Sequence, residues 1–94
     1  MARYIPVCGT ARWVRPANPP RFTHEEIWEH IGSPTVEISW LERIAGFRCG
    51  SLTMLAQEQE AEGLLPNETA SVLARQPIRG DVLLISPAED PRRN

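Results

Sequence analysis

The sequence contains no lysine, so all ten of its basic residues are arginine. It has no apolar run near the roughly 20 residues that a membrane-spanning helix needs. No apolar segment typical of a secretory signal follows Met1, and no Gly-rich phosphate-binding loop with its lysine is present. These absences argue against membrane insertion, secretion and P-loop chemistry. We therefore expect a cytoplasmic protein that makes no membrane contact.

Cysteine and histidine are scarce. A thiol enzyme needs a nucleophile, a base and an orienting group, and no nucleophile motif surrounds Cys8 or Cys49. We expect both thiols to be reduced. His24 and His30 are six residues apart and lack the i, i+4 spacing of a helical metal pair, and a zinc site needs three or four ligands. We therefore expect no metal, no cofactor and no catalytic residue.

Net charge is small, at −2, which gives no general electrostatic case for nucleic-acid binding. The charges are nevertheless unevenly distributed. Residues 1–21 contain four arginines and no acid, whereas residues 22–70 contain nine glutamates and two arginines. A basic first segment is thus followed by an acidic middle.

A chain of 94 residues with 41% hydrophobic content suits a single domain with one core. We predict one α+β domain over residues 1–94. It should have a mainly antiparallel sheet of four or five strands, with the helix Thr23–Ile31 packed on one face and a second short helix after Asn67.

The first helix has clear end signals. Thr23 and Glu26 have the spacing of a capping box, and Phe22 can pack on Ile27 as a hydrophobic staple. Gly32 suits a left-handed residue at the C-terminal end. A helix this short is marginal alone, so we expect it to dock on the sheet.

Strands are indicated by alternation and by turn residues. Pro6 favours an edge strand at residues 3–9, and a short extended piece is expected around Trp13. Residues 35–42 and 50–58 alternate as half-buried strands, and the glycines of residues 43–50 suggest a hairpin-like return between them. Residues 81–86 are apolar on both faces, which indicates a central strand or one covered on both sides.

The segment Asn67-Glu68-Thr69 is formally a glycosylation acceptor, but Asn is also an excellent helix N-cap. We expect the cap, with Val72 and Leu73 as the docking face of the helix that follows. The predicted core consists of Ile5, Val7, Ile27, Ile31, Val36, Ile38, Leu52, Met54, Val72, Val82 and Leu84.

The segments EEIWEHIGSPTVEI, LTMLAQEQEAEGLLPNETA and IRGDVLLI together resemble a family of small domains of unknown function. Members of that family are found largely in bacteriophages, plasmids and actinobacterial genomes. The resemblance implies a mobile-element accessory protein without established catalytic residues, and it transfers no functional residue to this chain.

Two sets of residues are candidates for binding. The first is an acidic surface that could occupy a basic groove on a partner. It consists of Glu58, Glu60, Glu62, Glu25 and Glu29. The second combines arginine with aromatic side chains, as sites that bind a nucleotide phosphate and stack its base do. It consists of Tyr4, Arg12, Trp13 and Arg15, although burial of Trp13 in the core is the interpretation we favour.

We favour a small non-enzymatic phage or mobile-element accessory protein that binds and inhibits a host macromolecule, such as a component of antiviral defence. Its partner would be a host protein or complex in the host cytoplasm. Direct nucleic-acid binding is not expected, and a homodimer stays open. The alternatives are a protein that binds and sequesters a nucleotide and, third, a hydrolase that uses Cys8 or Cys49.

Overall fold

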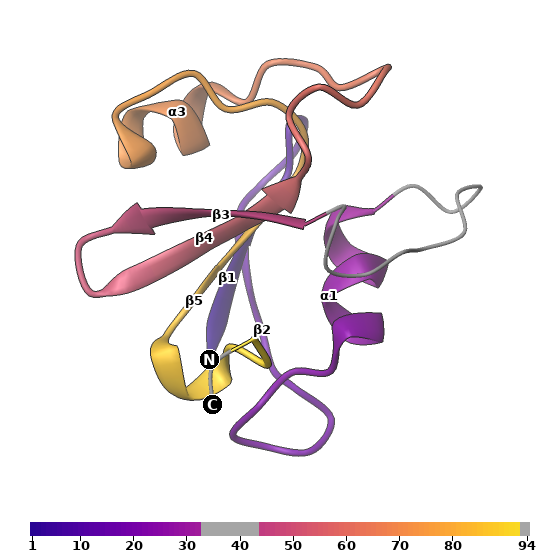
Figure 1. Cartoon of the computed structure of the whole chain (residues 1–94), viewed down its shortest axis with the longest axis vertical. Helices are drawn as coiled ribbons and strands as arrows, with labels where there is room; N and C mark the ends of the chain where they lie inside the picture. The colour runs from indigo at the N-terminus through magenta and orange to yellow at the C-terminus, as the bar shows by residue number, and fades with distance from the viewer. Residues whose placement is uncertain (33–43, 93–94) are drawn as a thin grey trace.

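The computed structural model describes residues 1–32 and 44–92. Within them, five strands form one antiparallel sheet, and two α-helices and a short 3-10 helix accompany it (Figure 1). The elements are β1 (Ala2–Ile5), β2 (Arg12–Val14), α1 (His24–Ile31), β3 (Ile44–Cys49), β4 (Leu52–Gln57), α3 (Glu68–Ala74), β5 (Val82–Ile85) and the 3-10 helix η1 (Pro87–Glu89).

The strand order in the sheet is β2-β1-β5-β4-β3. The predicted α+β class is confirmed, and so is the central position of the strand within residues 81–86. The two helices lie on opposite sides of the sheet, α1 on one and α3 on the other (Figure 1). Side chains on both faces of β5 can therefore be buried.

The prediction of an edge strand at residues 3–9 is wrong. β1 pairs with β2 on one side and with β5 on the other. Pro6 lies just past the last residue of β1, so its missing N–H is no obstacle to pairing on both sides. The short extended piece around Trp13 is β2, which takes the outer position instead.

The expected return at residues 43–50 is also a strand for most of its length. β3 pairs with β4 from Ile44↔Gln57 to Cys49↔Leu52, and the chain turns only at Gly50, whose φ of +63° suits glycine. Gly46 lies inside β3, where a Cβ atom would collide with the guanidinium group of Arg92.

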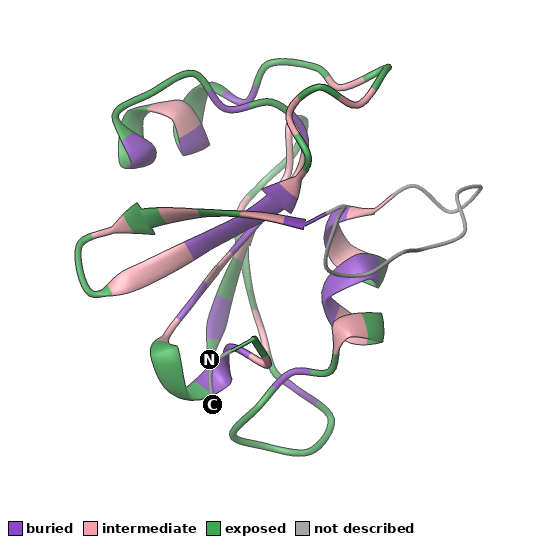
Figure 2. Ribbon diagram, in the orientation of Figure 1, coloured by how far each residue is buried: buried purple, intermediate pink, exposed green. Residues whose placement is uncertain are grey.

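Each face of the sheet carries its own apolar cluster. Figure 2 shows buried residues on the strands and on both helices. The cluster beneath α1 includes Phe22, Ile27, Trp28, Ile31, Leu55, Leu83 and Ile85. The cluster beneath α3 includes Ile5, Met54, Ala56, Ala70, Ala74, Ile78 and Val82. β4 is therefore covered on both faces, rather than half-buried as its alternation predicted.

The end signals of α1 behave largely as predicted. The Glu26 N–H donates to Thr23 Oγ1 at 3.2 Å, and the Thr23 N–H donates to Glu26 Oε1 at 2.9 Å, which completes the capping box. The bond from the Thr23 backbone is the main cause of a lowered pKa for Glu26. Gly32 is extended (φ −88°) and not left-handed. Glycine is required there because a Cβ atom would collide with the Trp28 ring.

The docking face predicted for the second helix is wrong. Val72 is 76% exposed and Leu73 is 41% exposed, whereas Ala70 and Ala74 are buried against the sheet. The N-cap is confirmed, since the Ala70 N–H donates to Asn67 Oδ1 at 3.0 Å.

Five of the predicted core residues are buried: Ile5, Ile27, Ile31, Met54 and Val82. Val7, Leu52 and Leu84 are partly exposed, and Val72 is on the surface. Val36 and Ile38, with the strand predicted at residues 35–42, lie outside the described residues.

Candidate functional site

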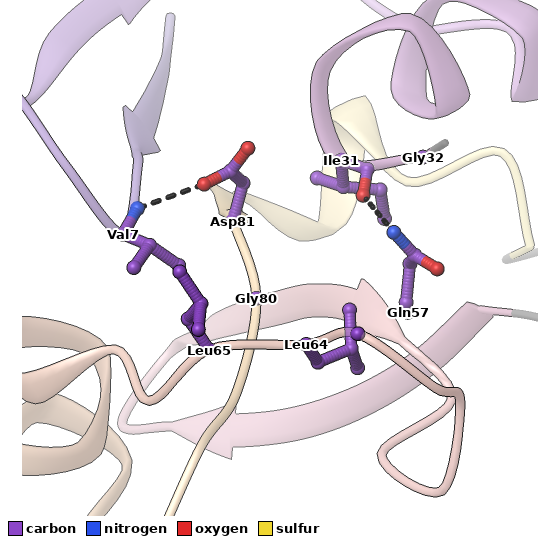
Figure 3. A pocket seen from close by; sticks show the side chains of 9 residues that line it. Val7, Ile31, Gly32, Gln57, Leu64, Leu65, Gly80 and Asp81 are labelled. Carbon is purple, nitrogen blue, oxygen red and sulfur yellow. Dashed lines mark hydrogen bonds between the residues drawn. The ribbon is translucent and has the colours of Figure 1, made fainter. Parts of the chain in front are cut away.

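A cavity of about 240 Å³ opens where four parts of the chain meet (Figure 3). They are the end of β1, the C-terminal end of α1, the loop from β4 to α3, and the approach to β5. Its lining residues are Val7, Ile31, Gly32, Gln57, Gly63, Leu64, Leu65, Gly80 and Asp81. Most of these are aliphatic or glycine, and Asp81 supplies the only formal charge among them.

The Asp81 carboxylate is held by two hydrogen bonds from β1 and the residues after it. The Val7 N–H donates to Oδ1 at 2.8 Å, and the Tyr4 hydroxyl donates to Oδ2 at 3.1 Å. Across the cavity, the Gln57 side-chain amide donates to the Ile31 carbonyl at 2.8 Å and so joins β4 to the end of α1 (Figure 3). Both walls are thus fixed by polar contacts.

Two further side chains surround Tyr4. The guanidinium Cζ of Arg12 lies 5.0 Å from the centre of the Tyr4 ring, and the His30 ring lies 5.4 Å from it. Burial, then the charge of Asp81, raises the pKa of Tyr4. Burial, then the charge of Arg12, lowers the pKa of His30. Both pKa shifts favour the uncharged forms of the Tyr4 and His30 rings near neutral pH.

The β4–α3 loop (residues 58–66) is held against residues 78–80. The Gln59 side chain accepts from the Arg79 N–H at 2.6 Å and donates to the Arg79 carbonyl at 3.0 Å. The Arg79 guanidinium donates to the Leu64 carbonyl at 2.8 Å, and the Gly80 N–H donates to the Leu65 carbonyl at 2.7 Å.

The consecutive residues Arg79, Gly80 and Asp81 each make contacts at this place. Arg79 holds the loop, and Asp81 holds the end of β1. Gly80 has a φ of +86°, and a Cβ atom there would lie 3.1 Å from Leu64. All three residues therefore have structural roles within the fold.

Asn67 is 2% exposed and makes three side-chain hydrogen bonds. Besides capping α3, its Nδ2 donates to the carbonyls of Ile5 and Gly80, each at 3.0 Å. The amide that a glycan would occupy is buried and already bonded, which favours the structural role over the acceptor role.

The predicted acidic residues are all exposed, but they belong to two elements. Glu58, Glu60 and Glu62 are in the β4–α3 loop, where the bonded Gln59 lies between the first two. Glu25 and Glu29 are on the outer side of α1. Leu65, at the end of the loop, is an exposed apolar residue, with 63% of its surface accessible.

The predicted arginine and aromatic set is divided by the register of the sheet. Tyr4 pairs with Arg12, and Arg3 pairs with Trp13. Because neighbouring residues of a strand point to opposite faces, Arg12 and Trp13 cannot contact one ligand from the same face. Trp13 is 63% exposed, so its expected burial in the core is wrong.

Arg15 lies apart from both Arg12 and Trp13. It lines a separate cavity of about 390 Å³ together with Pro16, Pro19, Pro20 and Glu89. Of the four residues of the predicted nucleotide site, Tyr4 and Arg12 are therefore in contact, whereas Trp13 and Arg15 lie apart from them.

The cysteines are also apart from the cavity. Cys8 is exposed after β1, and Cys49 lies at the end of β3, where burial raises the pKa of its thiol. A raised pKa disfavours the nucleophilic thiolate. In residues 1–32 and 44–92, no three His, Cys, Asp or Glu side chains are grouped as a metal site would require.

The described helices are also too short or too polar to cross a lipid bilayer.

Sequence reasoning missed Asp81, Gln57 and Leu65 as residues around a cavity. The only signal near them was the dipeptide Gly80-Asp81 at the start of an apolar strand. It does not specify that Asp81 reaches back to β1, because that contact depends on strand order.

Comparisons with protein-family models, with curated protein sequences and with solved structures found no match for this chain. The residues described above are therefore the basis for a functional proposal.

Proposed function

We propose that this is a non-catalytic binding protein whose acidic β4–α3 loop contacts a basic surface on a partner protein or protein complex. The supporting observation is the way the loop is held. The Gln59 side chain bonds the Arg79 backbone, and the Arg79 guanidinium donates to the Leu64 carbonyl of the loop. The side chains of Glu58, Glu60 and Glu62 are all exposed.

A fixed loop loses less conformational freedom on binding than a flexible one. Its glutamates can attract a basic partner over a distance of about one Debye length, roughly 10 Å at 0.1 M salt. The exposed Leu65 supplies an apolar contact beside the charges. Charged side chains that steer the partner and an apolar residue that is buried on contact form a common arrangement in protein interfaces.

The resemblance to mobile-element domains supports a phage or mobile-element origin. Under that origin the partner is a host macromolecule, such as a component of antiviral defence, and binding inhibits that partner. Glu25 and Glu29 on α1 extend the proposed surface. A homodimer is the alternative partner.

The test is capture of a partner from host lysate with purified tagged protein. The wild-type bait should retain one host protein reproducibly, and the variant Glu58→Arg/Glu60→Arg/Glu62→Arg should lose it. The variant Arg12→Ala/Arg15→Ala is the matched control and should retain it. Retention by the triple variant would show that the loop is not the contact surface.

The nucleotide-sequestering alternative has one supporting contact, Arg12 over the Tyr4 ring. Against it stands the separation of Arg12, Trp13 and Arg15. Heat denaturation of the purified protein, followed by analysis of the supernatant, should release no stoichiometric nucleotide, and release of one would favour this alternative.

A further inference from the structure

The cavity beside Asp81 has the features of a site for one cationic group. Asp81 is partly buried, and its two oxygens each accept one hydrogen bond from a neutral donor, Val7 N–H and Tyr4 O–H. A carboxylate oxygen can accept more than one hydrogen bond. Both oxygens therefore keep acceptor capacity.

Among the described residues, no cation forms an ion pair with this carboxylate. In residues 1–32 and 44–92, the ion pairs join the amino terminus to Glu89 and Arg92 to Asp90. Arg12 approaches closely enough to lie over the Tyr4 ring, but it forms no ion pair with Asp81. Within this part of the chain, the charge of Asp81 is thus available to a ligand.

The size and walls of the cavity restrict what that ligand is. A volume of about 240 Å³ lies below the roughly 300–1,000 Å³ of pockets for drug-sized ligands. Val7, Leu64 and Leu65 present aliphatic surface, against which the methylene stem of a long basic side chain packs well. One side chain fits this description better than a whole nucleotide.

We propose that the cavity binds the guanidinium group of an arginine side chain on the partner protein, with Asp81 as its acceptor. This inference rests on the proposed function, because the same acidic loop that attracts a basic partner forms one wall of the cavity. Leu64 and Leu65 belong to that loop. An arginine at the centre of the partner's basic surface would therefore reach Asp81 as the loop docks.

The experiment titrates ¹⁵N-labelled protein with N-acetyl-arginine amide and follows backbone amide shifts by NMR. We expect saturable shifts at Val7, Gly63, Gly80 and Asp81. N-acetyl-citrulline amide has nearly the same shape without the charge, and it should produce no saturable shifts. Equal responses to the two probes, or shifts confined to Glu58, Glu60 and Glu62, would overturn the proposal.

Asp81→Asn is the matching variant, since its side-chain oxygen can still accept from the Val7 N–H. It should weaken binding of the arginine probe by about tenfold or more, because charge-assisted hydrogen bonds are roughly twice as strong as neutral ones. Glu68→Gln removes one negative charge at an exposed position of α3 that does not line the cavity, and it should leave the affinity nearly unchanged. Equal affinity of Asp81→Asn and wild type would contradict the assignment.

Free L-arginine distinguishes a protein-borne side chain from a small metabolite. Tighter binding of free L-arginine than of the blocked amide would assign the cavity to a metabolite and overturn the proposal. All titrations are done without the partner protein. A failed titration with successful capture from lysate refutes only the arginine site, and a successful titration with failed capture refutes only the proposed function.

Discussion

Asn67 makes more contacts than a helix cap needs. Its Oδ1 caps α3, and its Nδ2 joins the Ile5 carbonyl at the end of β1 to the Gly80 carbonyl before β5. Three segments that are distant in sequence therefore meet at one buried amide. The cap was predictable from residue type and position, whereas the two other bonds depend on the strand order.

Replacing Asn67 with alanine should destabilise the protein by about 2–4 kcal/mol. Loss of the cap accounts for about 1 kcal/mol, and buried acceptors left without a donor account for about 1–3 kcal/mol. Urea denaturation of the purified protein measures the difference. Thr69→Ala is the control, because it removes the glycosylation motif at an exposed position and should change stability by no more than about 0.5 kcal/mol. Similar losses of stability for both variants would contradict the role of Asn67 in joining α3 to the end of β1 and to the residues before β5.

At the scale of elements, α3 shows where a pattern of large apolar residues misleads. Val72 and Leu73 are the largest apolar residues of the helix, yet the face toward the sheet is formed by Ala70 and Ala74, which are four residues apart. Residues at i and i+4 share one face of a helix. Small side chains on that face let the helix lie close to Met54 and Val82.

In α3, changing a small buried residue should therefore lower stability more than truncating a large exposed one. Ala70→Val adds volume at a buried site and should cost about 1–3 kcal/mol through overpacking. Val72→Ala removes an exposed side chain, and alanine favours helix more than valine does, so stability should change by about 0.5 kcal/mol or less. Thermal and urea denaturation of both variants would measure this. A larger loss for Val72→Ala than for Ala70→Val would indicate that α3 packs through its other face.

Among the strands, the sequence pattern predicted the position of β5 correctly but not the burial of β4. The apolar run at residues 81–86 predicted the central strand correctly, because only a strand covered on both faces is apolar on both. β4 alternates in sequence but is buried on both faces, since Leu55 packs beneath α1 while Met54 packs beneath α3. The position of a strand in the sheet depends on pairing between distant segments, so local periodicity does not predict it.

At the scale of the whole molecule, the sequence correctly indicated separate basic and acidic segments, and all five predicted glutamates are exposed. It could not indicate that Arg12 and Trp13 face opposite ways, because that follows from the register between β1 and β2. Nor could it reveal the cavity beside Asp81, which forms only when β1, α1 and the β4–α3 loop come together. Composition and periodicity thus predicted the class of fold and the exposed charges. The order and register of the strands determine which residues meet at the cavity.

This separation of charge leads to a prediction about the rate of partner binding. If the β4–α3 loop steers a basic partner, the association rate should fall as salt rises, because exposed charges are screened. Reversing Glu58, Glu60 and Glu62 to arginine should slow association at low salt by about tenfold or more, since steering raises such rates by 10–1,000-fold, and should flatten the salt dependence. Arg12→Ala/Arg15→Ala should leave both the rate and its salt dependence nearly unchanged. Stopped-flow or surface-binding kinetics at low and high salt would measure these rates with the captured partner.

The nucleotide-binding alternative expects the reverse ranking, because arginine makes the phosphate contacts. Equal and negligible effects of both variants would place the binding energy in apolar contacts such as that of Leu65 and refute electrostatic steering by the loop.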